Sequence, residues 1–268
     1  MVAIIGFTMT ACDGGDTTTA SLGNELKLTN QQVWTATWDE NETTGVPSVS
    51  YQHFNGDLTI EWADDYNGSG SVKGGKLSLT LGTPPSEYLE LLGNDDDEDE
   101  SEGPIYTISD PTVKGMLLFG LSTENGSIGR FKTSYSGTQN NLSASDEMVM
   151  YYYVDKDVTF SATKYTDNDE YTEDGFTHKE TYTHNAYSIN LKKGWNALHQ
   201  KYSYTESFNA ATNTWTTTAT ISASASNPSS VYWVYSEWND DNYSILPSGE
   251  AAPRKPSFKP PRSIFGKK

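Results

Sequence analysis

Two acidic stretches hold the side chains best suited to binding a metal ion. Residues 95–102 carry seven carboxylates in eight positions. The second stretch, residues 167–175, is expected to form one short loop that offers four more ligands: Asp167, Asp169, Glu173 and Asp174. Calcium prefers oxygen ligands, but its binding loops need alternating ligands and a sharp glycine turn, and neither stretch has that pattern. We therefore predict a solvated loop at 95–102 and no metal site, with the four carboxylates of the second stretch as the alternative cation ligands.

Catalytic chemistry has weaker support. The four histidines lie in different segments, and none has the spacing of a zinc ligand. Gly126-Ser127-Ile128-Gly129 is not a nucleophile elbow, and glycine and serine are ordinary residues in a turn. We predict no enzymatic activity and no cofactor. With 36 acidic residues in the chain, a glycosidase-like carboxylate pair stays open as the alternative.

Cys12 is the only cysteine among 268 residues, and its surroundings are specific. It follows an apolar run at residues 2–7 and the tetrapeptide Met9-Thr10-Ala11-Cys12. This pattern resembles the bacterial lipoprotein signal, or lipobox, whose cysteine becomes the mature N-terminus. The resemblance implies cleavage of a truncated signal peptide, residues 1–11, and a diacylglycerol on Cys12 that anchors the chain through acyl chains such as palmitate. Because no Lys or Arg precedes the apolar run, we expect translation to begin upstream of Met1.

The charge of the chain is strongly negative and unevenly distributed. The formal net charge is −18 and the pI is about 4.4. Residues 251–268 hold six cations and no acid, so residues 1–250 carry 18 − 6 = 12 cations against 36 acids, a net charge of −24. Binding of nucleic acid phosphates needs clustered cations, so we exclude nucleic acid as a partner.

Aromatic residues are the better indication of binding. The chain has 17 Tyr and 7 Trp. The runs Tyr151-Tyr152-Tyr153 and Tyr232-Trp233-Val234-Tyr235 must place large rings on both faces of a sheet, so we expect some rings to reach the outer surface. Exposed rings offer apolar platforms to sugars and to proteins. The platform residues that we predict are Trp215, Trp233, Tyr235 and Trp238.

Within residues 31–245, separate segments alternate apolar and polar residues with a period of two, as in half-buried strands. About ten such segments follow one another almost without helix. We predict an all-β fold, an antiparallel meander that forms a barrel or a sandwich, with at most one short helix, at residues 87–92. We expect a flexible tether at 12–30, a single β domain at 31–245 and a disordered, proline-rich basic tail at 246–268. Two lobes divided near residue 140 are the alternative.

Glycines mark the expected hairpin corners. Val72-Lys-Gly-Gly-Lys-Leu77 has the pattern of a tight hairpin turn. Leu191-Lys-Lys-Gly-Trp195 repeats it, and we predict that Leu191 pairs with Trp195 and that Gly194 adopts a left-handed conformation. Val113-Lys-Gly-Met116 is a looser third copy.

The lipobox, the aromatic strands and the stretch Tyr187-Ser-Ile-Asn-Leu-Lys-Lys-Gly-Trp-Asn196 together resemble uncharacterised β-rich lipoproteins of spirochaetes, especially treponemes. The resemblance implies a lipid-anchored place in the cell envelope, with the outer membrane or cell surface favoured over the inner membrane. Our leading hypothesis is a non-enzymatic envelope lipoprotein that binds a host or envelope protein or a glycan. The alternatives are a carbohydrate-binding module that uses exposed Trp and Tyr, and a barrel that carries an apolar small ligand.

Overall fold

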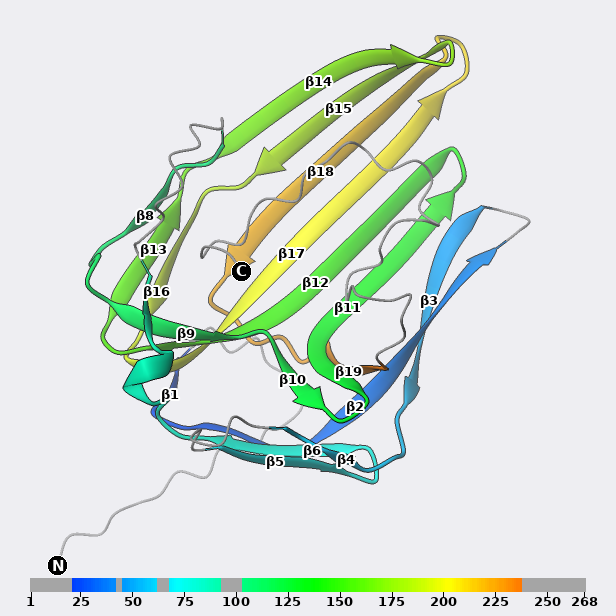
Figure 1. Ribbon diagram of the computed structural model, residues 1–268. Coiled ribbons are helices and arrows are strands. Elements are labelled where there is room, and N and C mark those ends of the chain that lie inside the picture. The colour runs from blue at the N-terminus through cyan, green and yellow to red at the C-terminus, as the bar shows by residue number, and fades with distance from the viewer. Residues whose placement is uncertain (1–20, 42–44, 62–67, 93–102, 238–268) are drawn as a thin grey trace, which may run out of the picture.

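The computed structural model describes residues 21–41, 45–61, 68–92 and 103–237 (Figure 1). These residues form nineteen strands and one 3-10 turn, Ser86–Tyr88. The all-β prediction is confirmed. The short helix expected at 87–92 is replaced by that single turn, because Glu90–Leu91 (β7) pairs with the strand Lys114–Leu118 (β9).

One large twisted sheet dominates the molecule. Its central strands run in the order β14-β15-β18-β17-β12-β11-β19-β2, and the path continues through β6, β5 and β4. The bounds of the central strands are Tyr165–Glu173 (β14), Phe176–His184 (β15), Thr214–Ser224 (β18), Gly194–Asn209 (β17), Asn141–Val154 (β12), Gly126–Thr138 (β11), Tyr232–Glu237 (β19) and Leu26–Asn41 (β2). The other members are Ser21–Gly23 (β1), Val46–His53 (β3), Leu58–Thr59 (β4), Gly68–Lys73 (β5), Lys76–Leu81 (β6) and Gly120–Thr123 (β10), together with β7 and β9.

The strand β2 bends from one part of this sheet into another. Its first residues pair with β6, with Leu26 opposite Leu81, and its later residues pair with β3 and β19. Between them the register shifts, and Asn30 adopts a φ of 52°, as at a β-bulge. The bend sets β4, β5 and β6 across the lower end of the main sheet (Figure 1).

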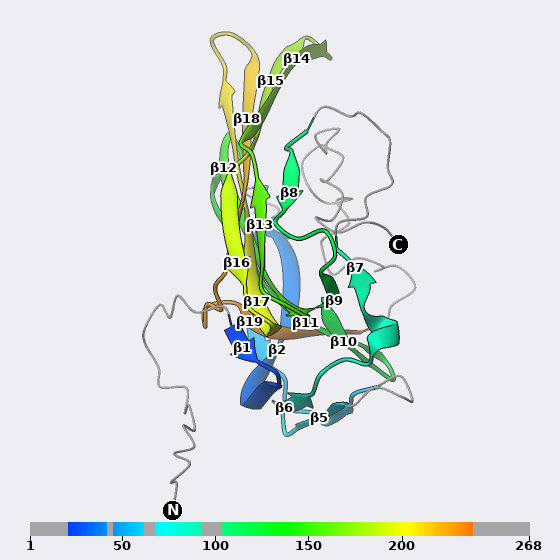
Figure 2. The same cartoon turned by 90° about the vertical axis from the view of Figure 1, so that its left-hand side faces the viewer.

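A separate sheet of three strands packs against one face of the main sheet (Figure 2). It consists of Tyr187–Leu191 (β16), Val158–Ala162 (β13) and Tyr106–Ile108 (β8). Of its apolar side chains, Val158, Phe160, Ile189 and Leu191 meet Met150, Tyr152, Val154 and Leu198 of the main sheet. A second core lies on the opposite face, where Leu77, Leu79 and Leu81 of β6 join Tyr151, Tyr153, Trp195 and Trp233.

These two cores explain the tyrosine run. Tyr151 and Tyr153 point into one core and Tyr152 into the other, and the three side chains are only 2–3% exposed. None of these three rings reaches the outer surface, so the expectation is wrong for this run, whereas Tyr232 of the second aromatic run is partly exposed. Alternation along a strand places rings on both faces, but here both faces of the sheet are covered.

Two further expectations need correction, although one of the two predicted arrangements, the sandwich, is supported. The sheet is open and is not a closed barrel, consistent with a sandwich-like arrangement. It is not a simple antiparallel meander, because β15 pairs with β18 and β19 with β2 in parallel. The strands also number nineteen among the described residues where about ten were expected.

Of the glycine corners, only the first is a hairpin turn. Val72 pairs with Leu77, and Gly74 and Gly75 have positive φ values of 51° and 72°. Leu191 pairs with Val158 and Trp195 with Tyr153, so the Lys-Lys-Gly corner is a crossover between sheets. Gly194 does have the predicted positive φ, 101°, and a side chain there would collide with the carbonyl oxygen of Gly23. Gly115 lies inside β9 and makes no corner.

Candidate functional site: two unlike faces of an open sheet

Six neighbouring strands extend beyond the small three-stranded sheet: β14, β15, β18, β17, β12 and β11 (Figures 1 and 2). Their pairing register fixes which side chains share a face, because successive residues of a strand point to opposite sides. The two faces of this extension differ sharply in chemistry. We call them the hydroxyl face and the aromatic face.

The hydroxyl face carries small polar side chains in rows across the strands. One row takes a hydroxyl from each of the six strands: Thr166, Thr183, Thr220, Ser203, Ser145 and Ser134. The next row is Asn168, Thr181, Thr218, Thr205, Ser143 and Ser136. Thr181 Oγ1 donates to Asn168 Oδ1 at 3.0 Å. Threonine suits a pleated, half-solvated surface, so these rows keep the face wet while favouring strand conformation.

The aromatic face is defined by Tyr135, Tyr165, Tyr171, Phe176, His178, Tyr182, Tyr202, Tyr204, Phe208 and Trp215. Several of these rings touch. Tyr171 and His178 stack with centroids 4.8 Å apart and planes at 7°. Phe208 lies 4.7 Å from Trp215 and 5.9 Å from Phe176. These defining side chains are all partly exposed, so the face combines apolar area with access to solvent.

Carboxylates are interleaved with these rings. The Tyr171 hydroxyl donates to Glu180 Oε1 at 2.9 Å, and the Tyr204 hydroxyl donates to Glu206 Oε2. Desolvation, followed by the bond to Glu180, raises the pKa of Tyr171 to about 12. Burial likewise raises the pKa of Tyr204, and Glu206 adds to that shift. The two tyrosines therefore stay neutral hydrogen-bond donors at neutral pH.

The charges of the six strands separate by face. The aromatic face holds six carboxylates and no Lys or Arg along these described strands: Asp146, Asp167, Asp169, Glu173, Glu180 and Glu206. The hydroxyl face of the same strands holds the cations Arg130, Lys132, Lys179 and Lys201 with only two acids, Glu147 and Glu170. The sheet is thus polarised across its thickness, and the aromatic face attracts positive charge.

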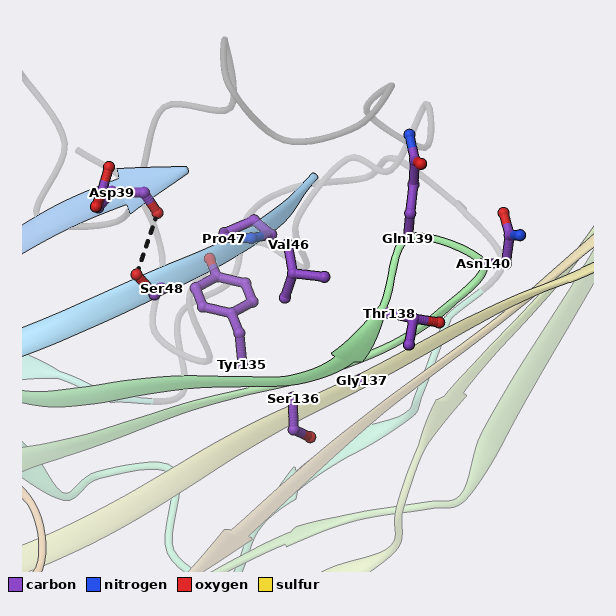
Figure 3. A pocket seen from close by; sticks show the side chains of 10 residues that line it. All are labelled: Asp39, Val46, Pro47, Ser48, Tyr135, Ser136, Gly137, Thr138, Gln139 and Asn140. Atoms are coloured by element: carbon purple, nitrogen blue, oxygen red, sulfur yellow. Dashed lines mark hydrogen bonds between the residues drawn. The ribbon is translucent and has the colours of Figure 1, made fainter. Parts of the chain in front are cut away.

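A pocket of about 540 Å³ opens at the β11 end of the aromatic face. It lies between the β2–β3 hairpin and the β11–β12 turn, and Figure 3 shows Tyr135 pointing toward Val46 and Pro47 while Ser136 points the other way. Its volume falls in the range of small-ligand sites. Trp38, which the sequence did not single out, is 41% exposed and meets the Tyr135 ring at 6.3 Å.

A half-buried carboxylate lies close to this pocket. Asp146 accepts a 2.5 Å hydrogen bond from Thr133 Oγ1, and burial raises its pKa above the usual value. Desolvation, together with the Asp146 charge, raises the pKa of Tyr135 to about 12. Asp146 thus carries a solvation penalty that no nearby cation offsets on the described aromatic face.

At the base of the aromatic face, His184 is buried with 1% exposure between β15 and the small sheet. Its ring lies 5.8 Å from Tyr106 and 5.7 Å from Tyr187. Its Nδ1 atom finds no hydrogen-bond partner among the described residues, and burial lowers its pKa. We assign it a packing role as a neutral side chain.

Arg130 is buried under the opposite face and is fully hydrogen-bonded. Its guanidinium donates to the carbonyl oxygens of Val231 and Pro228, to Asn227 Oδ1 and to the hydroxyl of Tyr151. It also lies 5.7 Å from the Trp233 ring centre. Arg130 therefore fixes the segment that leads into β19, and no pattern in the sequence indicated this role.

The predicted platform residues differ in their exposure to solvent. Trp215 lies on the aromatic face and is partly exposed. Trp233 and Tyr235 are buried, at 5% and 6% exposure, because they point into the core toward β2 and β6, so their prediction as exposed rings is wrong. Trp238 and Cys12 lie outside the described residues, as does the acidic stretch 95–102.

The four candidate cation ligands do not lie on one loop. Asp167 and Asp169 are exposed on β14, opposite Tyr182 and Glu180, since pairing with β15 draws this stretch into a strand. Glu173 ends β14, and Asp174 occupies the turn with a φ of 53°. Within the described residues, no three His, Cys, Asp or Glu side chains come together as a metal-binding group.

No family model, curated protein or solved structure matches this chain. Among the described residues, no helix has the length and hydrophobicity of a membrane span.

Proposed function

We propose that this protein is a non-enzymatic, lipid-anchored lipoprotein of the cell envelope that binds its partner on the aromatic face. The single observation that carries the binding role is the polarised open sheet, with partly exposed rings and carboxylates on one side and hydroxyl rows on the other. Cys12 and the lipobox-like residues before it support the anchor.

A lipid on Cys12 would hold the protein at the membrane, so the β domain would be needed only to bind a partner. Each buried methylene of an acyl chain stabilises membrane attachment by about 0.8 kcal/mol, so a diacylated cysteine holds a water-soluble domain stably. The β domain then needs no apolar surface for the membrane, and its exposed rings remain available to a partner.

Binding fits the geometry of this face better than catalysis does. The rings and carboxylates lie on an open, solvated surface, whereas electrostatic catalysis gains most in a site that excludes water. Aromatic anchors with polar groups beside them are the usual composition of a recognition surface.

A carbohydrate is the second candidate ligand. The tyrosine–carboxylate pairs Tyr171–Glu180 and Tyr204–Glu206 place hydrogen-bonding groups beside rings on which a sugar could stack. A closed barrel that carries an apolar ligand has no counterpart in the open sheet.

Fractionation of cells that express the native gene tests the anchor. The wild-type protein should pellet with membranes and move into the detergent phase, because the acyl chains on Cys12 provide the affinity. Cys12→Ser should be recovered in the aqueous phase. A wild-type protein that stays aqueous, or a Cys12→Ser protein that partitions like wild type, would contradict the proposal.

A further inference from the structure

We propose that the aromatic face binds the basic C-terminal segment of the same chain, residues 251–268. This inference deepens the proposed binding role of that face and rests on it, but it does not depend on the lipid anchor. The argument uses the charge of the face, the chemistry of the segment and the length of chain that joins them.

Charge complementarity is the first argument. The described strands of the aromatic face present six carboxylates without a Lys or Arg, and Asp167 and Asp169 are exposed. Residues 251–268 hold the cations Arg254, Lys255, Lys259, Arg262, Lys267 and Lys268 and no acid. This is the strongest concentration of positive charge in a chain of net charge −18.

The rings supply the second argument. A cation over an aromatic face is attracted by the ring quadrupole, and arginine also stacks flat on such rings. The segment contains four prolines, Pro253, Pro256, Pro260 and Pro261. Proline-rich segments favour the extended polyproline conformation and dock on surfaces lined by aromatic side chains. The ring pairs Tyr171–His178 and Phe208–Trp215 provide such a surface.

The third argument is reach. The last described strand, β19, ends at Glu237, opposite Gly126 of β11. From Glu237 to Arg254 is 254 − 237 = 17 residues, which span at most about 56 Å. β18 lies four strand spacings from β19, about 19 Å across the sheet. The rise along β11 from Gly126 to Tyr135 is about 30 Å, so the diagonal from the end of β19 to the centre of the aromatic face is about 35 Å. Arg254 can therefore reach the centre of the aromatic face, and the tether makes docking effectively intramolecular.

Zero-length carbodiimide cross-linking of the full chain tests this inference, because it joins only Lys and carboxylate groups in direct contact. Lys255 and Lys259 should cross-link to Asp167, Asp169, Glu180 or Glu206, independently of protein concentration. The yield should fall about tenfold at 1 M salt, where the Debye length is roughly 3 Å. Glu170, on the same strand β14 but on the hydroxyl face, is the internal control and should stay unlinked to the segment.

A second measurement follows the acetylation rates of Lys255 and Lys259. Asp167→Asn with Asp169→Asn should raise these rates to those of a free peptide of residues 251–268, and Glu170→Gln should leave them unchanged.

Three results would overturn the inference: cross-links to Glu170 in equal yield, acetylation rates already equal to those of the free peptide, or cross-link yields that rise with protein concentration. The last result would indicate that the segment binds a second copy of the chain. Displacement of the segment by glycan oligosaccharides would agree with the inference, because both would then bind the same face. Glycan binding that depends on Trp215, without a cross-link between the segment and the aromatic face, would contradict the inference and favour the carbohydrate alternative. Membrane partition of the Cys12 variants is unaffected by all these results, so the two proposals fail separately.

Discussion

The hydroxyl of Tyr51 on β3 accepts a hydrogen bond from the backbone N–H of Thr133 on β11, at 2.6 Å and across 82 positions of sequence. β19 pairs with β11 only as far as Phe131, so beyond that point Tyr51 occupies the edge position where the next strand partner would lie. This contact ties β3 to the edge of β11, so it also fixes the β2–β3 hairpin, whose residues Val46, Pro47 and Ser48 line the neighbouring pocket.

Removal of that hydroxyl should loosen the hairpin. Tyr51→Phe leaves the partly buried N–H of Thr133 without its acceptor, which should lower the free energy of unfolding by about 1–3 kcal/mol. Urea unfolding measures this change. Tyr135→Phe, a hydroxyl deletion on the same face, is the matched control and should cost less than about 0.5 kcal/mol. Equal losses for the two variants would mean that the Tyr51–Thr133 bond does not contribute to stability.

Asp146 should destabilise the native state at neutral pH. Burial raises its pKa above the usual 3.8, so the folded protein binds more protons than the unfolded chain just above that pH. The free energy of unfolding therefore falls as pH rises through this window and stays lower above it. Asp146→Asn should be more stable than wild type at pH 7, and the advantage should shrink toward pH 3.

Asp110 provides a control of opposite sign for that measurement. Lys156 and Thr112 lower the pKa of Asp110 to about 2, so its charged form favours folding above the unfolded pKa. Asp110→Asn should therefore lose stability at neutral pH and lose nothing once the carboxyl is protonated. The same pH profile for Asp110→Asn and Asp146→Asn would contradict both assignments.

His184 should make the fold sensitive to mild acid. Burial holds its pKa below the usual 6.5, so the unfolded state binds more protons as pH falls through that value, and stability is lost on the acid side. The melting temperature should drop between about pH 6.5 and pH 5, and His184→Phe should flatten that slope. His53→Asn, at an exposed position, should retain it. His199, whose pKa burial also lowers, contributes in the same direction, so some slope will remain.

Arg130 should be the least replaceable charged residue in the described core. Arg130→Met removes the donors from several buried oxygens, each costing about 1–3 kcal/mol, so we expect a loss of about 3–5 kcal/mol in a urea titration. Arg130→Lys should fall well short of rescue, because an ammonium cannot reproduce the planar fork. Lys132→Met, the next cation on the same face, should change stability by less than about 1 kcal/mol. A tolerated Arg130→Met would show that the network is not structural.

Local alternation was enough to predict the strands and the all-β class. It was not enough to predict the partners of those strands, because pairing depends on contacts far apart in sequence. Leu191 and Trp195 fit a hairpin by spacing, yet Leu191 pairs with Val158 and Trp195 with Tyr153. The positive φ of Gly194 could still be predicted, since it is a local property of the backbone.

The same limit applies to the binding face. Polar residues, mostly threonines, alternate with aromatic and acidic residues in 176–184, and threonines flank Trp215 in 214–221, so the two chemistries of the sheet were present in the sequence. Alternation says that two faces exist, but coverage by other strands decides which rings remain accessible. Trp215 remains accessible and Trp233 does not, because only Trp233 lies where the core of β2 and β6 covers the sheet.

The intact mass of the native protein, extracted from membranes with detergent, tests the lipid-anchored account most directly. We predict a chain that begins at Cys12 and carries the added mass of a thioether-linked diacylglycerol, with or without a further acyl group on the amine. A chain that still carries residues 1–11 and an unmodified thiol at Cys12 would contradict it.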